Sequence, residues 1–452
     1  MKLLIVVRNF YPSTLGGPSL TLYWLAKALL NQGIDVTVIT SSDHVPVNKV
    51  AFDKWIELDG IHVYFASVEE SDSFHCPVTK MMKRYIKDMD VILLGSLFYK
   101  PSFFTSVWAK LYHKKVIWSP RGELFPAAIN NKRFKTFYVK VLNKLFGKRT
   151  LFHATSEIES TYIKQYFGEA KYYILPNYMT LPERATRNPH CPYLLFVGRI
   201  APIKALDKLL EALAISKKFR ESGYTFCIAG GVEAQFEIYY QSLLILISKL
   251  QLKGKVEFLG SITGKKKEQL YADAYMSFLV SKSENFGNVV IEALAQGTPV
   301  IASKGTPWSS LNECEAGFWV SNDSQSLAMC IDEILMMQPE TYQRMRQNAL
   351  KLAENFDVER NISLDTNSIS KSSVSAEIIN TIKAERSRKK AGFIAQELEK
   401  VFPEAVYTLP NGKKAIAYLE IIPLLVEAIK EQQNEIDELK QAKTVQTRSV
   451  IG

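Results

Sequence analysis

The sequence predicts an α/β protein built from two doubly wound parallel sheets in series, followed by a small α+β appendage. Short apolar runs alternate with helical patterns over residues 1–181, and the alternation restarts at Tyr193. Such alternation is typical of parallel sheets whose strands are joined by helices. The aperiodic segment 180–192 contains three prolines and separates the two runs. A chain of 452 residues is also longer than one ordinary core supports.

The first half of the chain carries the pattern of one such sheet. Apolar runs predict strands at residues 3–7, 36–40, 90–94, 116–118 and 151–153. A helix is predicted over about 19–31, and Gly33 ends it. Ser156 and Glu159 have the spacing of a capping box, which predicts that another helix begins there.

The second half repeats this pattern. Strands are predicted at residues 193–197, 224–229, 256–259, 276–280 and 300–302, with helices from about Leu206, up to Leu250 and from Val289. The predicted domains are residues 1–181 and 182–362, then a linker rich in Ser and Asn at 363–384 and a C-terminal unit at 385–452. Two doubly wound sheets in series leave a cleft between their facing strand ends, which is where ligands of such sheets bind.

The composition limits the class of protein. Hydrophobic residues make up 47% of the chain and charged residues 23%, as in soluble globular proteins. No apolar run reaches the ~18 residues of a membrane span, and residues 1–7 are interpreted as a strand and not as a signal peptide. Five cysteines without pairing or ligand spacing indicate the cytoplasm. With no Asp-x-Asp motif after a strand and no His/Cys cluster, no metal site is expected.

Part of the net charge of +10 is concentrated in residues 132–149, which contain seven basic and no acidic residues. Apolar residues recur there at helical spacing. One interpretation is an amphipathic helix that lies on the inner, anionic face of the cytoplasmic membrane. The other is a solvated helix whose apolar stripe faces the core. Nucleic acid is not an expected partner, because no nucleic-acid-binding motif is present.

Four short motifs of the second half place polar and glycine residues near predicted strand ends. They are Gly198-Arg199 with Lys204 downstream, Gly230-Gly231, residues 281–288, and residues 292–301, which begin with Glu292. Two cations that follow a strand, near a helix N-terminus, suit a diphosphate. Gly287 lets backbone N–H groups approach oxygens closely. Taken singly, such charges are usually solvated surface residues; their combination in one α/β unit favours a ligand site.

Together these motifs resemble the donor domain of the family 4 retaining glycosyltransferases, which have the GT-B fold. The resemblance is strongest over residues 193–310 and covers about 1–360. It implies that Arg199 and Lys204 hold the diphosphate of a UDP- or GDP-sugar, without a metal or other cofactor. It also implies that Glu284 binds the transferred sugar and Glu292 the ribose. The other implied donor-binding residues are Gly16, Gly17, Gly198, Gly230, Asn285, Phe286, Gly287, Asn288 and Val289.

Three positions outside these motifs need separate interpretation. Ala205 departs from the family, which usually has Gly after the Lys, and this costs little unless the backbone φ is positive. Arg121 stands in a Pro-Arg-Gly segment near the point where many relatives have a His, and is expected to face the cleft as a catalytic residue. His153 is interpreted as a packed strand-end histidine rather than as a base. For Gly16 and Gly17, an ordinary βα turn is the alternative.

The C-terminal segment 391–440 resembles the intramolecular chaperone of phage tailspikes and endosialidases, a trimerising and self-cleaving domain. Apolar residues spaced by three and four predict a coiled coil, and residues 419–440 would then form a homo-oligomer. The Ser-Lys pair that the family uses for cleavage is missing, and only Ser370, Ser372, Ser375 and Ser387 are candidates by position. The tail begins where the last transferase helix usually crosses back to the first domain.

The resemblances imply a retaining, metal-independent transfer of sugar from a nucleotide donor to a glycan or lipid-linked acceptor. Surface polysaccharide biosynthesis (capsule, O-antigen or exopolysaccharide) is the expected context, and no protein nucleophile is expected. Two alternatives remain open at this point. One is a GT-B-fold nucleotide-sugar epimerase, and the other is a sugar-nucleotide-binding assembly protein with a trimerising tail.

Overall fold

The computed structural model describes residues 1–13, 16–46, 48–67, 77–129, 133–188, 192–358 and 360, and two short strands at 406–408 and 414–416. The chain divides into two compact units, Met1–Val358 and Glu359–Gly452. The first unit contains both predicted sheets. None of its described helices is both long enough and apolar enough to span a bilayer.

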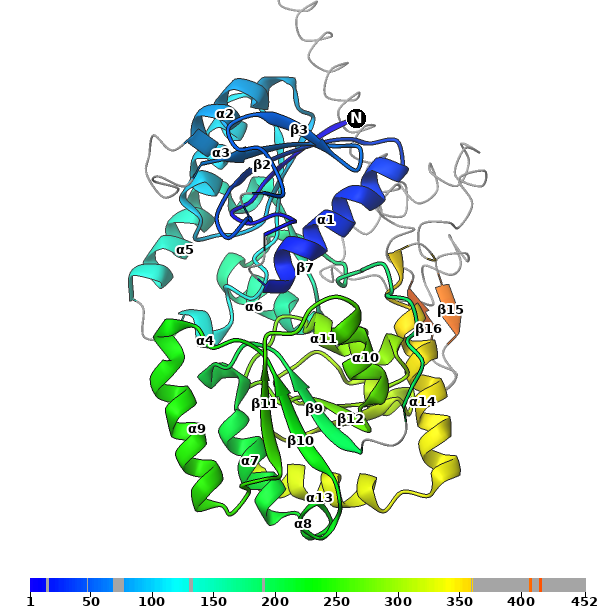
Figure 1. Cartoon of the computed structure of the whole chain (residues 1–452). Helices are drawn as coiled ribbons and strands as arrows, with labels where there is room; N and C mark the ends of the chain where they lie inside the picture. The colour runs from blue at the N-terminus through cyan, green and yellow to red at the C-terminus, as the bar shows by residue number, and fades with distance from the viewer. Residues whose placement is uncertain are drawn as a thin grey trace, which may run out of the picture. The chain divides into compact units, whose positions relative to one another are not determined.

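The first sheet, to which the labelled strands β2, β3 and β7 of Figure 1 belong, has eight strands in the order β3-β4-β2-β1-β5-β6-β7-β8. All neighbours in it are parallel except β3 and β4. The strands are β1 Lys2–Val6, β2 Asp35–Ser41, β3 Trp55–Leu58, β4 Ile61–Ala66, β5 Val91–Leu94, β6 Lys115–Trp118, β7 Thr150–Ala154 and β8 Lys171–Ile174. The five strands predicted from apolar runs are confirmed, while β3, β4 and β8 were not predicted.

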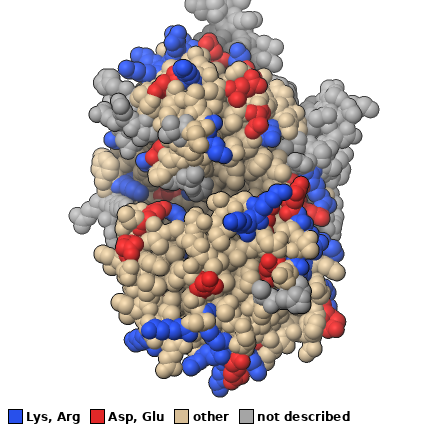
Figure 2. Space-filling view, viewed as in Figure 1, with Lys and Arg blue, Asp and Glu red and all other residues tan. Residues whose placement is uncertain are grey.

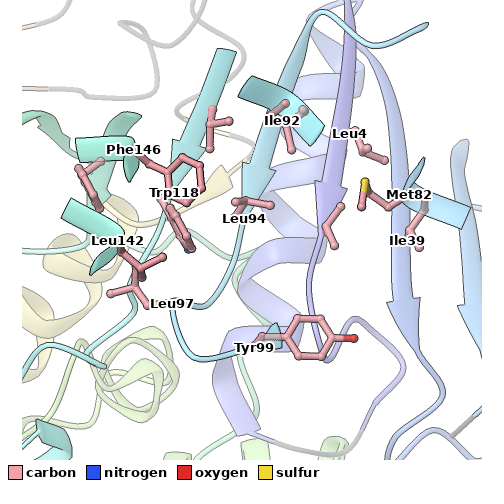
Figure 3. Close-up of a cluster of buried hydrophobic side chains, with 14 of the residues drawn as sticks. Leu4, Ile39, Met82, Ile92, Leu94, Leu97, Tyr99, Trp118, Leu142 and Phe146 are labelled. Carbon is pink, nitrogen blue, oxygen red and sulfur yellow. The ribbon is translucent and has the colours of Figure 1, made fainter. Parts of the chain in front are cut away.

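Helices connect these strands and cover the sheet. They are α1 Gly16–Asn31, α2 Pro77–Tyr85, α3 Lys100–Leu111, α4 Pro126–Ile129, α5 Arg133–Phe146 and α6 Glu157–Phe167, with 3-10 turns η1 Ile86–Asp88 and η2 Gly147–Arg149. Figure 3 shows Leu4, Leu94 and Trp118 of the sheet in one cluster with Leu142 and Phe146 of α5. One side of α5 is therefore part of the core.

The second sheet has six parallel strands in the order β11-β10-β9-β12-β13-β14. They are β9 Tyr193–Val197, β10 Thr225–Ala229, β11 Val256–Gly260, β12 Met276–Leu279, β13 Val300–Ser303 and β14 Gly317–Val320. Alternation along β9 directs Leu194 and Phe196 into one core cluster and Leu195 into another, because successive side chains point to opposite faces. Both faces of this sheet are therefore buried.

The helices of the second half lie around this sheet. They are α7 Leu206–Ile215, α8 Lys217–Glu221, α9 Glu237–Lys249, α10 Lys265–Asp273, α11 Asn288–Ala295, α12 Ser310–Glu313, α13 Ser324–Leu335 and α14 Pro339–Glu354, with η3 Pro202–Lys204 and η4 Ala234–Phe236. After α14 the chain meets the segment between the sheets: Met179 N donates to Phe356 O at 3.1 Å, and Val358 N donates to Met179 O at 3.1 Å. The prediction of two doubly wound parallel sheets in series is confirmed.

The second unit contributes β15 Val406–Thr408 and β16 Lys414–Ile416, which pair antiparallel. The predicted linker at 363–384, the four candidate serines and the coiled coil at 419–440 lie outside the described residues. On the visible face in Figure 2, Lys and Arg form several separate groups over the described part of the surface.

Candidate functional site

The carboxyl ends of three neighbouring strands define the candidate site in the second sheet. β9 pairs with both β10 and β12, so the residues that follow these strands lie along one edge. Gly198 N donates to Ala229 O at 2.9 Å, and Gly230 N donates to Gly260 O at 2.8 Å. A Cβ on Gly230 would lie 1.8 Å from Gly198 O. The backbones of the two predicted glycines are therefore in direct contact, and a side chain at Gly230 would not fit between them.

Lys204 and Glu284 form an ion pair at this edge. Lys204 Nζ lies 2.5 Å from Glu284 Oε2, and Ser281 Oγ donates to the same oxygen at 3.1 Å. Both side chains are mostly buried. The backbone fixes the two segments as well, because Lys282 N donates to Ile203 O at 2.8 Å. The structure therefore brings together two of the four predicted charged residues, from positions 80 residues apart.

Arg199 has a different partner. Its Nη1 lies 2.8 Å from Glu233 Oε1, and this pair is exposed, with 56% of the Arg199 side chain and 36% of the Glu233 side chain accessible. The hydrogen bonds from Arg199 and Gln235 lower the pKa of Glu233. Glu233 follows the Gly230-Gly231 strand end, and no sequence motif singled it out.

Glu292 lies in α11 and is held by α10. Its Oε1 lies 2.7 Å from Lys267 Nζ, and its Oε2 accepts a hydrogen bond from Tyr271 at 3.1 Å. Burial, and then the Glu292 charge, raise the pKa of Tyr271. The structure thus gives Glu284 and Glu292 separate polar partners on different elements.

The loop before α11 is shaped by its apolar residues. Gly287 has φ 89°, and a Cβ there would lie 2.5 Å from Leu279 Cδ2, so glycine is required. Phe286 is buried, and its carbonyl accepts from Trp308 Nε1 at 2.5 Å. Val289 also packs against the core. The side chains of Phe286 and Val289 therefore support the loop, and contact with a ligand would come from the backbone at the helix N-terminus.

Asn285 and Asn288 connect this loop to the first sheet. Thr155 Oγ1 donates to Asn285 Oδ1 at 3.0 Å, and Asn288 Nδ2 donates to Thr21 Oγ1 at 3.0 Å. A Cβ on Gly17 would lie 3.1 Å from Asn288 Nδ2. The predicted glycine loop, Gly16 and Gly17 at the start of α1, therefore lies against the α11 N-terminus. Sequence reasoning missed Thr21 and Thr155, although Thr155 directly follows β7 and lies two residues after the strand predicted at 151–153.

Arg121 lies beside these contacts in a left-handed conformation with φ 50°. Its Nη1 donates to Asn177 Oδ1 at 3.4 Å, and Asn177 Nδ2 donates to Asn288 Oδ1 at 3.1 Å. Arg121 Nε and Nη2 are buried without a hydrogen-bond partner among the residues that the structure describes. Burial lowers the pKa of Arg121 to about 10, although Glu159 and Tyr173 act in the opposite direction. The guanidinium therefore stays charged at neutral pH, and its Nε and Nη2 groups can donate hydrogen bonds to a ligand.

Glu159 fixes the loop that carries Arg121. It accepts hydrogen bonds from Gly122 N at 2.5 Å and Thr155 N at 2.8 Å, while Ser156 Oγ accepts from Glu159 N at 3.3 Å. The bond to Ser156 Oγ is one of the two hydrogen bonds of the predicted capping box. The second would join the Glu159 carboxylate to Ser156 N. The carboxylate instead binds the N–H of Thr155, the residue before the cap, and it also binds Gly122 N. Burial raises the pKa of Glu159.

His153 is packed and uncharged. It is buried, its Nε2 lies 2.9 Å from Leu175 O, and its ring stacks on Tyr173 with centroids 5.2 Å apart. Burial, and then the nearby Arg121 charge, lower the pKa of His153 to about 3. These contacts favour the packed interpretation over the role of a base.

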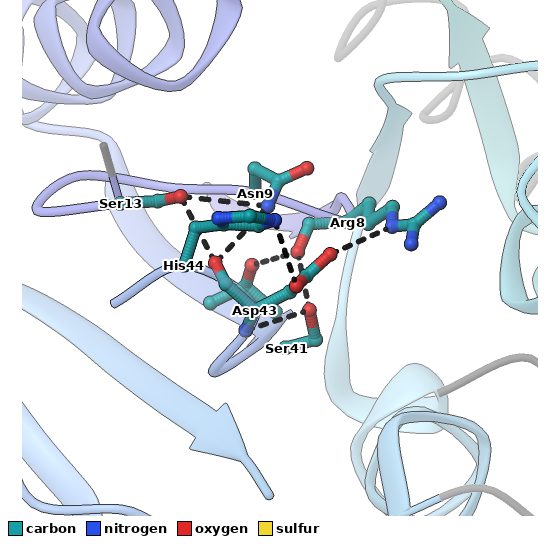
Figure 4. Close-up of polar contacts among 7 residues, drawn as sticks. Arg8, Asn9, Ser13, Ser41, Asp43 and His44 are labelled. Atoms are coloured by element: carbon teal, nitrogen blue, oxygen red, sulfur yellow. Dashed lines mark hydrogen bonds and ion pairs between the residues drawn. The ribbon is translucent and has the colours of Figure 1, made fainter. Parts of the chain in front are cut away.

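A polar cluster at the carboxyl ends of β1 and β2 completes this region of the first sheet (Figure 4). Arg8 Nε lies 3.1 Å from Asp43 Oδ2, and His44 Nε2 lies 3.5 Å from Asp43 Oδ1. Asn9 Nδ2 donates to Asp43 O at 3.2 Å. Among the causes that lower the pKa of Glu233, the His44 charge comes after the hydrogen bonds and charge of Arg199 and the hydrogen bond of Gln235.

Ala205, the departure noted in the sequence, has φ 53° and is fully buried. The left-handed conformation costs a residue with a Cβ about 1–2 kcal/mol, whereas Gly costs about 0.5–1 kcal/mol in chain entropy. Removing the buried methyl also costs about 0.8 kcal/mol, so we expect Ala205→Gly to keep the free energy of unfolding within about 0.5 kcal/mol of the unaltered chain in urea titrations. Ala201, in the same loop with φ −146° and also buried, is the matched control. Ala201→Gly should lose about 1.5 kcal/mol from methyl burial and chain entropy together, and equal losses in both variants would contradict the argument.

Among the residues that the structure describes, no three His, Cys, Asp or Glu side chains are grouped so as to hold a metal ion.

Three family models match the chain. Residues 15–179 match Glycosyltransferase Family 4, residues 180–352 match Glycosyl transferases group 1, and residues 378–407 match Chaperone of endosialidase. The chain is 32% identical over 171 residues to the D-inositol 3-phosphate glycosyltransferase of Mycobacterium sp. (strain KMS). That match covers 37% of each chain, so the chain spans little more than a third of the length of this curated relative.

Solved structures extend the similarity over more of the fold. Anabaena HepE in complex with UDP-glucose matches with a TM-score of 0.64 at 20% identity, over 85% of this chain and 100% of that one. Sucrose-phosphate synthase from Thermosynechococcus elongatus matches with a TM-score of 0.64 at 18% identity, over 82% of this chain and 98% of that one. At these identities the likeness establishes the fold.

Proposed function

Because residues 15–352 belong to the family 4 and group 1 glycosyltransferases with the GT-B fold, we propose that the chain transfers a sugar from a nucleoside diphosphate to a glycan or lipid-linked acceptor. The Lys204–Glu284 ion pair at the shared edge of β9 and β12 is the observation that carries this proposal. In the proposed site, Lys204 would bind the diphosphate and Glu284 would accept hydrogen bonds from the sugar hydroxyls.

Arg199 is the second cation of the proposed diphosphate site. In this structure it pairs with Glu233, but both side chains are substantially exposed, and an exposed pair contributes only about 0–1 kcal/mol. A charge-assisted bond to a phosphate oxygen contributes about 1.5–3 kcal/mol. A bound donor can therefore take Arg199 from Glu233 at small cost. Glu292, oriented by Lys267 and Tyr271, would accept hydrogen bonds from the ribose hydroxyls.

The proposed reaction retains the sugar configuration and uses no metal and no protein nucleophile. The bond between the sugar and the phosphate oxygen breaks, and the acceptor oxygen attacks the same face of the sugar. The acceptor proton passes to the departing phosphate. Arg199 and Lys204 stabilise the negative charge that grows on the leaving diphosphate. Arg121 Nε and Nη2, which have no hydrogen-bond partner within the described part of the chain, are suited to hold a sugar or phosphate oxygen on the other side of the site.

The wider setting is also a proposal. We place the enzyme in the cytoplasm, at the inner face of the cytoplasmic membrane, in the synthesis of a surface polysaccharide such as capsule, O-antigen or exopolysaccharide. The match of residues 378–407 to Chaperone of endosialidase supports a self-associating tail.

The proposal is tested with the full chain and a panel of nucleotide sugars. We expect one of UDP-glucose, UDP-N-acetylglucosamine or GDP-mannose to raise Tm by an amount that grows with its concentration relative to Kd, and the same compound to be the donor in transfer to a glycan. UDP-glucose is tried first, since Anabaena HepE binds it. EDTA should leave the rate unchanged.

Three results would count against the proposal: a panel in which no compound stabilises the protein, a covalent sugar–protein adduct seen by mass spectrometry, or conversion of the donor to its epimer without an acceptor. The last would establish the epimerase alternative.

A further inference from the structure

The apolar stripe of α5 is divided between two environments. Val139, Leu142 and Phe146 are buried in the core of the first sheet. Phe134 and Phe137 are 78% and 65% exposed, and Leu145 is 39% exposed. One side of the helix thus packs into the core, and a second apolar row faces outward.

The outward row follows the helical period. Phe134, Phe137 and Leu145 are separated by three and eight residues, so they lie along one side of α5. Exposed Lys140 and Lys144 border this row, and exposed Lys148 and Arg149 follow in η2. No acidic residue occurs between 133 and 149. Figure 1 shows α5 at the outer edge of the first sheet.

The neighbouring end of α3 extends this face. Lys110 Nζ donates to Leu145 O at 3.3 Å, and the next residue, Leu111, is 59% exposed. An apolar and cationic surface formed by the ends of two helices is thus available beside the first sheet. We call Phe134, Phe137, Leu145, Lys140 and Lys144 the α5 outer face.

We propose that the α5 outer face docks on the surface of an anionic lipid bilayer. Aromatic side chains enter the boundary between headgroups and acyl chains, while lysines on the same helix meet the phosphates. A second copy of the chain fits the face less well, because its lysines would oppose like charges. Nucleic acid would use the charge but leave the exposed Phe side chains without an apolar environment. Only the idea that docking brings the site to a lipid-linked acceptor rests on the proposed function.

Sedimentation with vesicles tests the docking. The full chain should bind vesicles of phosphatidylcholine with added phosphatidylglycerol, and bind phosphatidylcholine alone weakly. Phe134→Asp with Phe137→Asp should weaken binding at least tenfold, because each aromatic ring that fails to leave water has a large effect. Lys140→Glu with Lys144→Glu should weaken it about tenfold and reduce its salt dependence.

The control is Ile238→Asp on α9, a helix beside the second sheet, where the Ile238 side chain is 86% exposed. It should bind vesicles as the unaltered chain does. Because all five positions are exposed, Tm should stay the same in every variant. Docking is overturned if the chain does not bind anionic vesicles, if the α5 variants bind as well as the control, or if they instead abolish a dimer seen by sedimentation.

Stabilisation by a nucleotide sugar separates this proposal from the preceding one. A chain that binds the donor but not vesicles contradicts docking alone. A chain that binds vesicles through α5 but gains no stability from any nucleotide sugar contradicts the proposed function alone.

Discussion

Lys204→Ala is expected to lower kcat/KM for sugar transfer by about two orders of magnitude. The side chain is mostly buried and its Nζ lies 2.5 Å from Glu284. Removing it deletes a charge-assisted bond to the leaving diphosphate, about 1.5–3 kcal/mol, and leaves the Glu284 carboxylate without its cation. A loss of about 2.7 kcal/mol corresponds to a hundredfold change in rate. Arg199→Ala and Glu292→Ala are expected to have effects of similar size.

Steady-state kinetics with the donor identified by thermal shift provides the measurement. Lys266→Ala on α10 is the matched control, since Lys266 is exposed and lies outside the ion pairs of the site. The separate changes in kcat and KM show whether Lys204 binds the ground state or the transition state. A fall in kcat alone indicates a contact made only in the transition state. A rise in KM alone indicates a contact already made with the bound donor. Unchanged kinetics in Lys204→Ala would remove the assignment of the site.

The fold was largely predictable because most strands of both sheets are buried on two faces and are read as continuous apolar runs. The strands missed at the sheet edges have weaker patterns. β3, β8 and β14 lie at edges, and most of their residues are only partly buried. β4 is different, because five of its six residues are buried and its apolar pattern could have revealed it.

Site residues that directly follow a strand could be predicted from the sequence. Their ion-pair partners on other elements could not. Gly198, Gly230 and the loop at Glu284 meet because parallel strands end at one edge. The partners of Arg199 and Glu292 come from a loop and a helix without a motif of their own, Glu233 and Lys267. Which of several nearby opposite charges a side chain pairs with depends on distances of a few ångströms, and these distances cannot be derived from sequence spacing.

Contacts between the two sheets were the least predictable. Asn177, Asn288 and Thr21 form a continuous hydrogen-bonded chain from positions far apart in the sequence. The resemblance implied Asn288 as a donor-binding residue, but nothing in the sequence indicated its contact with Thr21, because Asn and Thr are common in turns and at helix ends. Arg121 was predicted to face the cleft, but its left-handed backbone and its missing partners come from the packing of the loop against Glu159.

Gly230→Ala is expected to be the most damaging single methyl addition at the candidate site. The new Cβ would lie 1.8 Å from Gly198 O and 2.8 Å from Gly198 C, both backbone atoms. Neither atom can rotate away, so the ends of β9 and β10 must separate. Overpacking of a rigid region costs about 1–3 kcal/mol, and we expect the upper end, about 3 kcal/mol, because the neighbour is backbone. The shift moves Gly198-Arg199, so donor affinity should fall together with stability.

Gly231 provides a control one residue away. No heavy atom lies within 4 Å of a Cβ built there, and its φ is not positive. Gly231→Ala should therefore change the free energy of unfolding by less than about 0.5 kcal/mol and leave the thermal shift with the donor intact. Urea titration of both variants, with and without nucleotide sugar, measures stability and affinity in the same samples. Equal stability in the two variants would mean that the strand ends at β9 and β10 are looser than their packing indicates, and that Arg199 is not positioned by Gly230.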